Sequence, residues 1–99
     1  MQIDKTKCYF IPADELLNFA EEIQPENGTD FQLPELYRML ECDTIEVVRL
    51  HSPERWLIID EDGKNKERPL NLTATVLSQL YPHDVIVGHA VMCPKRFLK

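Results

Sequence analysis

The sequence predicts an α+β fold, a single small domain in which two to three helices pack on a mixed or antiparallel sheet with a central hairpin. Three observations predict it. The chain has 99 residues, which leaves room for one hydrophobic core. Stretches with strand-like and helix-like apolar spacing follow one another in the order β-α-α-β-β-α-β. A short turn separates two of the strand-like stretches, which favours an antiparallel hairpin.

The first strand is expected over Lys7–Ile11, after an N-terminal tail over residues 1–6. Aromatic and β-branched residues fill this stretch, and such residues are enriched in strands. Pro12 follows, and proline cannot donate to the hydrogen-bond ladder of a central strand. We therefore expect the strand to end there and to lie at an edge of the sheet.

A first helix is expected between Asp14 and Ile23. Asp14 is a suitable N-cap, and apolar side chains recur after it at three- and four-residue spacing as far as Ile23. Glu21 and Glu22 fall on the opposite, solvent-facing side. A loop over residues 24–32, which contains a proline and an Asn-Gly pair, ends this helix.

A second helix and a hairpin are expected in the middle of the chain. The helix starts at Pro34, where the missing N–H costs nothing, presents a leucine stripe, and ends near residues 41–43. Two β-branched stretches follow, Thr44–Leu50 and Arg55–Asp60. The four turn-forming residues 51–54 lie between them, so we expect these two strands to pair as an antiparallel hairpin.

A third helix is expected over Leu72–Leu80, with Asn71 as its N-cap. Its spacing places Ala74 and Leu77 on the inner side, together with either Leu80 or Val76. This helix is expected to pack against the sheet.

The last strand is expected over Val85–Met92, ended at Pro94 and followed by a tail over residues 94–99. The stretch is nearly continuously apolar, which is typical of a strand buried on both faces. We therefore expect it to be the central strand. An edge strand elsewhere in the sheet can stay open to another chain, and a homo-oligomer is the expected assembly.

The composition argues against nucleic acid and membranes as partners. The net charge is −6, whereas a phosphate backbone is bound by a basic face. No apolar run approaches the roughly 18 residues that a membrane span needs. Three scattered cysteines without a Cys-X-X-Cys pair, and an N-terminus unlike a signal peptide, favour a reducing compartment. We expect a cytoplasmic protein.

The acidic turn Asp60-Glu61-Asp62-Gly63 invites comparison with a calcium-binding loop. In such a loop the glycine is the sixth residue and a bidentate glutamate is the twelfth. Gly63 is only the fourth residue from Asp60, so the spacing fails. We interpret the segment as a solvated turn in which Gly63 adopts a positive φ.

No catalytic residue, metal site or cofactor is predicted. Among the histidines and cysteines, His89 and Cys93 would share one face of the last strand, which supplies at most half of a metal site. The same pair would be the base and nucleophile if the protein were a small enzyme. The chain has three glycines and therefore lacks a glycine-rich phosphate loop.

The candidate ligand-binding site consists of Arg68, Asn71, Thr75 and Asp84. A helix N-terminus with polar side chains and a nearby arginine is suited to a small anion, and Lys64 and Lys66 make this stretch locally basic. The alternative is that Asn71 only caps the helix.

Several stretches resemble a small family seen mainly in phages, plasmids and bacteria and catalogued as a domain of unknown function (DUF3846). The stretches that carry the resemblance are Phe31–Leu40, Ile45–Val48, Leu57–Lys64, Pro69, Asn71, Ala74, Thr75 and Asp84–Val91. The family has a Gly-Gly pair where this chain has Cys42-Asp43, and usually an arginine where it has Leu72. The resemblance implies a compact accessory protein of mobile elements, without an assigned activity.

Two functions follow as hypotheses. The first is a non-enzymatic, homo-oligomeric binding protein for a small anionic or nucleotide-like ligand at the candidate site. The alternative is an acidic interaction module that docks on a basic host protein and modulates it.

Overall fold

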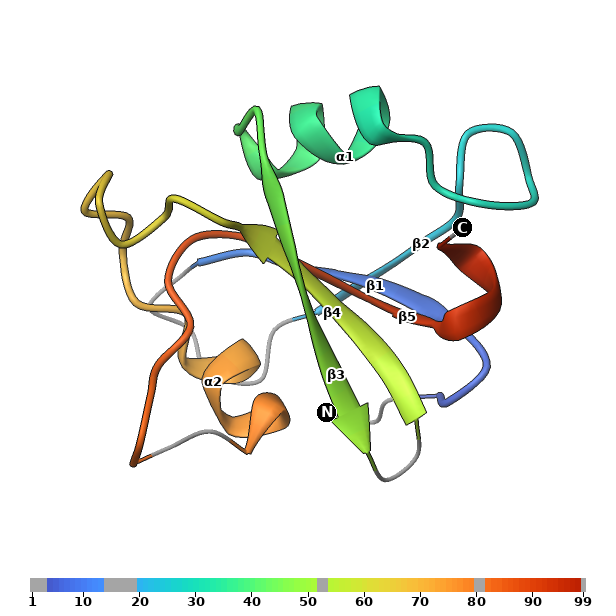
Figure 1. Cartoon of the computed structure of the whole chain (residues 1–99). Coiled ribbons are helices and arrows are strands. Elements are labelled where there is room, and N and C mark those ends of the chain that lie inside the picture. The colour runs from blue at the N-terminus through green and yellow to red at the C-terminus, as the bar shows by residue number, and fades with distance from the viewer. Residues whose placement is uncertain (1–3, 14–19, 52–53, 80–81, 99) are drawn as a thin grey trace.

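The computed structural model describes residues 4–13, 20–51, 54–79 and 82–98. Within them, five strands form one sheet in the order β2-β1-β5-β4-β3, and every neighbouring pair is antiparallel. Helices α1 and α2 lie on opposite sides of this sheet (Figure 1). The elements are β1 (Cys8–Ile11), β2 (Glu21–Ile23), α1 (Leu33–Leu40), β3 (Ile45–His51), β4 (Glu54–Asp60), α2 (Leu72–Ser78), β5 (Ala90–Pro94) and the short 3₁₀ helix η1 (Lys95–Phe97). The predicted α+β class is confirmed.

Strand β5 is the central strand, as its apolar sequence predicts, and all five of its residues are buried. It begins at Ala90, however, and the prediction of a strand from Val85 is wrong. Gly88 has a φ of 80°, which interrupts the extended backbone. The preceding residues instead pair with the segment that leads into α2, because Asn71 N donates to Ile86 O at 2.8 Å and Leu70 bridges Val87.

The N-terminal part differs most from the prediction. Strand β1 has the expected end at Ile11, but it pairs with both β2 and β5 and is not an edge strand. The expected helix over 14–23 is wrong at its C-terminal end, because Glu21–Ile23 form β2; positions 14–19, including the expected cap, lie outside the described residues. Hydrogen bonding to β1 outweighs the local helical spacing there.

Helix α1 and the hairpin confirm the sequence-based expectations. Pro34 stands in the first turn of α1, and Glu41 ends the helix in the left-handed conformation with a φ of 55°. Strands β3 and β4 pair from Ile45 opposite Asp60 to His51 opposite Glu54. This register leaves a two-residue connection at positions 52–53, which lie outside the described residues.

The sheet buries one apolar cluster on each face. Residues that α2 helps to cover are Tyr9, Ile11, Leu50, Leu57, Ile59, Ala74, Ile86, Ala90 and Met92. Residues that α1 helps to cover are Cys8, Phe31, Leu36, Leu40, Ile58, Val91 and Cys93. Alternate residues of each strand supply the two clusters, as the two-residue period of a strand requires.

Two smaller expectations need correction. Val76 does not lie on the inner side of α2, because it is 65% exposed, while Ala74 is buried, Leu77 packs against the core, and Leu80 lies outside the described residues. The tail expected over 94–99 begins inside the sheet and continues as η1, whose Phe97 O accepts a hydrogen bond from Phe31 N at 2.8 Å. None of the helices in the described residues is both long and apolar enough to cross a membrane.

Candidate functional site

Asn71 is the N-cap of α2 and is 1% exposed. Its Oδ1 accepts a hydrogen bond from Ala74 N at 3.0 Å, and its Nδ2 donates to Ile11 O and Gly88 O, both at 2.9 Å. One side chain thus ties the helix start to the end of β1 and to the segment before β5. All these bonds are internal, so the geometry favours the capping alternative for Asn71.

Thr75 is also buried and fully engaged. Its Oγ1 donates to Asn71 O at 2.7 Å and accepts from Ile86 N at 2.9 Å. The hydroxyl therefore satisfies a backbone N–H that would otherwise be buried without a partner. Thr75 lies beside Asn71, as predicted, but both side chains serve the packing of α2.

Asp84 lies on the surface, apart from these two residues. Its carboxylate forms an ion pair with Lys64 and accepts a hydrogen bond from Val85 N at 2.8 Å. The hydrogen bond from Lys64, with that from Val85, lowers the pKa of Asp84 below its ordinary value. Asp84 lines a small surface pocket of about 120 Å³ together with Glu46, Glu61 and Lys64. The acidic lining does not suit an anion.

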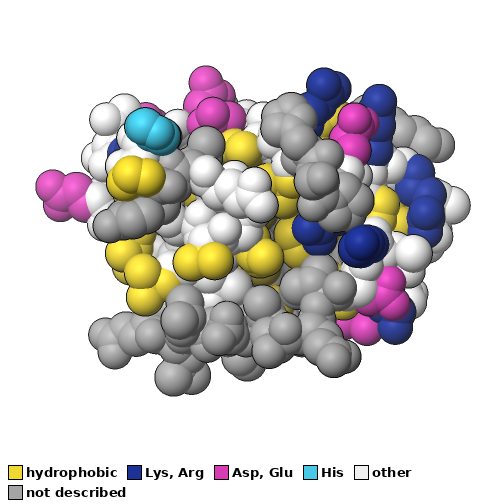
Figure 2. All heavy atoms as spheres, turned by 90° about the horizontal axis from the view of Figure 1, so that it is seen from below, with side chains coloured by type: hydrophobic (Ala, Val, Ile, Leu, Met, Phe, Trp, Pro, Cys, Tyr) yellow, Lys and Arg dark blue, Asp and Glu magenta, His cyan; other side chains and the backbone are white. Residues whose placement is uncertain are grey.

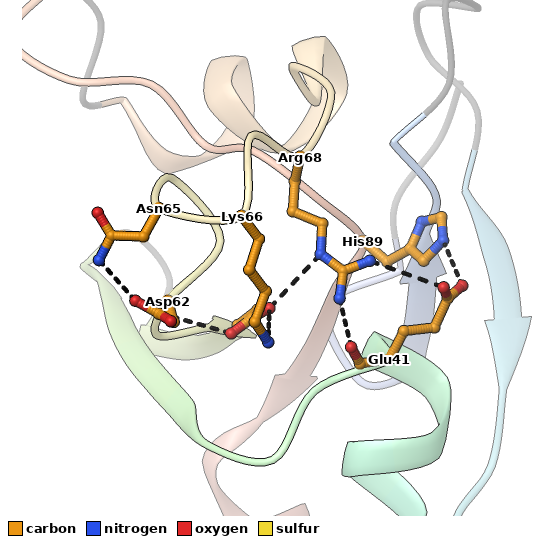
Figure 3. Close-up of polar contacts among 7 residues, drawn as sticks. Glu41, Asp62, Asn65, Lys66, Arg68 and His89 are labelled. Atoms are coloured by element: carbon orange, nitrogen blue, oxygen red, sulfur yellow. Dashed lines mark hydrogen bonds and ion pairs between the residues drawn. The ribbon is translucent and has the colours of Figure 1, made fainter.

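Arg68 belongs to a different group, a polar cluster formed by Glu41, Asp60, Lys66, Arg68 and His89 (Figure 3). The cluster joins the C-terminal end of α1, the loop after β4 and the segment that leads into β5. Arg68 Nη2 donates to Glu41 O, and Nη1 lies 3.6 Å from Glu41 Oε1. Arg68 Nε lies 3.6 Å from Asp60 Oδ2.

Asp60 is the buried member of the polar cluster, with only 4% of its surface exposed. It accepts hydrogen bonds from Asp62 N at 2.9 Å and from Lys66 Nζ at 3.0 Å. The bond to Asp60 raises the pKa of Lys66 above its ordinary value. The interpretation of a solvated turn is therefore wrong at Asp60, which anchors the loop that follows it.

Gly63 has a different role from the predicted one. It does not adopt a positive φ, unlike Gly28 and Gly88. A Cβ at Gly63 would lie 3.3 Å from both Asp60 O and Val87 Cγ2. The close approach of the loop to the segment before β5 thus leaves little room for a side chain at position 63.

His89 connects the polar cluster to the N-terminal strand region. Its Nδ1 accepts a hydrogen bond from Ala13 N at 3.0 Å, so that nitrogen carries no proton. The remaining ring nitrogen, Nε2, lies 3.3 Å from Glu41 Oε2 and is positioned to donate to it. The ring of Phe10 packs 5.3 Å from the imidazole, measured between centroids. The Glu41 carboxylate thereby bridges Arg68 and His89.

The enzyme hypothesis for His89 and Cys93 finds no support in this geometry. Cys93 is buried in the cluster under α1, and burial raises the pKa of its thiol to about 12. A thiol in that state is a poor nucleophile at neutral pH. Within the described residues, no group of three or more histidine, cysteine, aspartate or glutamate side chains is placed to hold a metal ion.

The structure therefore places the four predicted site residues in three locations. Asn71 and Thr75 adjoin each other in the interior, Asp84 pairs with Lys64, and Arg68 joins the polar cluster. Two members of the polar cluster, Glu41 and Asp60, are not among the site residues predicted from the sequence. Local periodicity carries no signal for them, because their partners come from other elements.

Comparisons with known proteins agree with the resemblance seen in the sequence. No curated protein and no solved structure matches the chain. Residues 9–96 match the family described as "Domain of unknown function (DUF3846)", and the match spans nearly the whole chain. The chain belongs to that family of domains of unknown function.

Proposed function

We propose that the protein is a small non-catalytic binding module that docks on another protein through the outer face of α2. Three apolar side chains make up this docking face: Leu70 is 44% exposed, Leu72 39% and Val76 65%. Helix α2, with the sequence LTATVLS, has no charged residue. Figure 2, the view from below and thus from the side of α2, shows hydrophobic side chains exposed at several places on this surface.

The absence of charge on an exposed helix is the observation that carries the proposal. A surface helix ordinarily turns charged and polar residues to solvent while its apolar stripe faces the core. In α2 the buried side chains include Ala74, Thr73 and Thr75, whereas Leu72 and Val76, four residues apart, face outward together. Exposed apolar residues grouped in this way are typical of an interaction surface.

The net charge of −6 favours a partner of opposite sign. Two copies of this chain repel each other at long range, whereas a basic partner is attracted, and salt weakens both effects. We therefore propose as the occupant a protein whose apolar site is bordered by lysine and arginine side chains. A second copy, which would make the homo-oligomer expected from sequence, is the competing occupant.

A photo-crosslinking amino acid at position 76 tests this proposal. On irradiation of cells that produce the protein, we expect a discrete adduct whose mass differs from that of two copies. When extracts are irradiated instead, the yield of this adduct is expected to fall as the salt concentration is raised. Val47, 40% exposed on β3, is the matched control position and is expected to give no such adduct. An adduct with the mass of two copies contradicts the basic-partner proposal, and no adduct contradicts the docking face. In the protein that carries the crosslinker at position 76, Leu72→Glu is expected to remove the adduct while changing the free energy of unfolding by less than about 0.5 kcal/mol, since Leu72 is 39% exposed.

A small anionic ligand remains the second candidate, now restricted to Arg68 and His89. The supporting observation is that these two side chains already bind one oxyanion, the Glu41 carboxylate. An incoming phosphate or carboxylate would have to displace it. Of the residues that the sequence predicted for this site, Arg68 is kept. Asn71 and Thr75 are left out, because their side chains form hydrogen bonds within the protein.

Replacing Glu41 with glutamine tests this second candidate. Removing the competing charge is expected to tighten binding of inorganic phosphate or AMP by about tenfold, the equivalent of one charge-assisted hydrogen bond. Thermal unfolding across a concentration series of each probe measures this effect, with Arg68→Met in the Glu41→Gln background as the control that abolishes it. If neither probe raises the unfolding midpoint of the Glu41→Gln variant, the anion site is excluded.

A further inference from the structure

Two of the three free cysteines face each other across neighbouring strands. Strands β1 and β5 pair with Tyr9 opposite Met92, Phe10 opposite Val91 and Ile11 opposite Ala90. The next pair in the same register is Cys8 and Cys93, each of which lies in its strand. Residues directly opposite in an antiparallel ladder point to the same face of the sheet. Both thiols accordingly lie in the apolar cluster under α1.

This pairing already meets the main geometric requirement of a disulfide. Opposite residues of an antiparallel pair have Cα atoms roughly 4.5–5.5 Å apart, whichever kind of pair they form. Disulfides span Cα separations of about 4.4–6.8 Å. The bond can therefore form without separating or sliding the strands.

A surface pocket borders one of the two cysteines, Cys8, which is 2% exposed. The pocket has a volume of about 240 Å³, and Cys8 lines it together with Ile23, Pro25 and Phe97. Lys7 and Glu22, also in its lining, form an ion pair at 3.3 Å. Cys93 is not part of the lining and is 0% exposed. A small reagent in the pocket thus meets Cys8 first.

We propose that Cys8 and Cys93 are a redox pair that closes into a cross-strand disulfide when a low-molecular-weight disulfide enters this pocket. The Cys8 thiolate attacks one sulfur of the reagent, which releases one thiol and leaves a mixed disulfide on Cys8. The Cys93 thiolate then attacks the Cys8 sulfur, the Cys8–Cys93 bond forms, and the second thiol leaves. Two protein thiols are oxidised, one disulfide reagent is reduced to two thiols, and the two thiol protons pass to solvent or to the leaving thiolates.

Burial sets the pH dependence of this reaction. It raises the pKa of the Cys8 thiol to about 11 and that of Cys93 to about 12. The thiolate is the nucleophile, so both steps are slow at neutral pH. While the pH stays below both pKa values, each pH unit raises the thiolate fraction about tenfold, and the rate rises with it. We therefore expect the thiols to react more slowly with the reagent as the pH is lowered.

The only tryptophan of the chain reports on the pair. Trp56 on β4 lies opposite Cys93. The guanidinium carbon of Arg49 lies 5.1 Å from the centroid of the Trp56 ring. The row Ile23, Cys8, Cys93 and Trp56 thus runs across four strands on one face of the sheet. Because a disulfide quenches a neighbouring indole, closure of the pair is expected to lower Trp56 fluorescence.

The experiment treats the folded Cys42→Ser protein with 2-hydroxyethyl disulfide at pH 7, 8 and 9 and follows mass and fluorescence. Cys42, half-buried, is replaced so that it cannot form adducts of its own. We expect loss of two hydrogens without a retained adduct, an about tenfold faster reaction per pH unit, and a fluorescence decrease that dithiothreitol reverses. Circular dichroism during the reaction shows that the protein stays folded.

Two further variants in this background separate the steps. Cys93→Ser is expected to retain one mercaptoethanol adduct on Cys8, because the resolving thiol is gone. Cys8→Ser is expected to stay unmodified, because the remaining thiol does not line the pocket. The proposal is overturned if the Cys42→Ser protein retains adducts on both thiols, if Cys8→Ser reacts as fast as Cys93→Ser, or if reaction requires unfolding.

Discussion

Replacing Asn71 with alanine is expected to lower the free energy of unfolding by about 3 kcal/mol. The substitution removes the cap of α2, a change that costs about 1 kcal/mol. It also leaves Ile11 O and Gly88 O without the buried donor that they share, at about 1 kcal/mol or more for each carbonyl.

Urea unfolding followed by circular dichroism measures the effect of this substitution. Asn71→Ser should recover about 1 kcal/mol, because a serine hydroxyl can still cap the helix but cannot reach both carbonyls. Val76→Ala, at an exposed position of the same helix, is the matched control and should change stability by less than about 0.5 kcal/mol. A loss below about 1 kcal/mol for Asn71→Ala would show that the buried amide contributes little to holding α2, β1 and the segment before β5 together. A change in phosphate or AMP binding without a loss of stability would instead restore Asn71 to the ligand site.

Replacing Asp60 with alanine should destabilise the protein by about 3 kcal/mol. Removing one partner of a buried ion pair costs more than the pair itself contributes, because the remaining charge loses its compensation. The cations left behind are Lys66 and Arg68, whose side chains are 33% and 23% exposed. The loop after β4 also loses the hydrogen bond from Asp62 N that starts its turn.

Salt dependence distinguishes this buried anchor from a surface ion pair. The cost of Asp60→Ala should persist in about 0.5 M salt, because screening acts weakly on buried charges. Asp84→Asn removes the exposed pair with Lys64 and should cost less than about 0.5 kcal/mol in low salt and nothing measurable in high salt. Lys66→Met, combined with Asp60→Ala in a double-mutant cycle, measures the coupling between the two residues. If Asp60→Ala and Asp84→Asn cost the same, Asp60 is not the anchor of this loop.

Local sequence signals predicted the elements whose stability comes from their own residues. The proline start of α1, the Asn71 cap of α2 and the strand pair β3–β4 lie where spacing, caps and turn residues indicate. The apolar composition of β5 likewise predicted its central position. Each of these features depends on a few residues that are neighbours in the sequence, and it can therefore be predicted from the sequence alone.

The tertiary structure decided features for which the decisive partner is distant in sequence. Residues 21–23 have a spacing that suits a helix, yet they form β2 because β1 offers a ladder of hydrogen bonds. Arg68 was predicted from sequence as a ligand-binding residue, but its partners, Glu41 and Asp60, come from other elements. Asp60 carries the charge expected of a solvated turn and is nevertheless buried.

The sequence by itself thus determined the α+β class, the hairpin, two helices and the family, whereas the site depended on the folded chain. Hydrophobic periodicity specifies which face of an element is buried, but it does not specify which charges meet across elements. The free energy of a buried carboxylate or amide depends on donors that only tertiary contacts bring within hydrogen-bond distance. For this reason Asn71 could be recognised as a cap from sequence, while its bonds to Ile11 and Gly88, and the opposition of Cys8 to Cys93, required the structure.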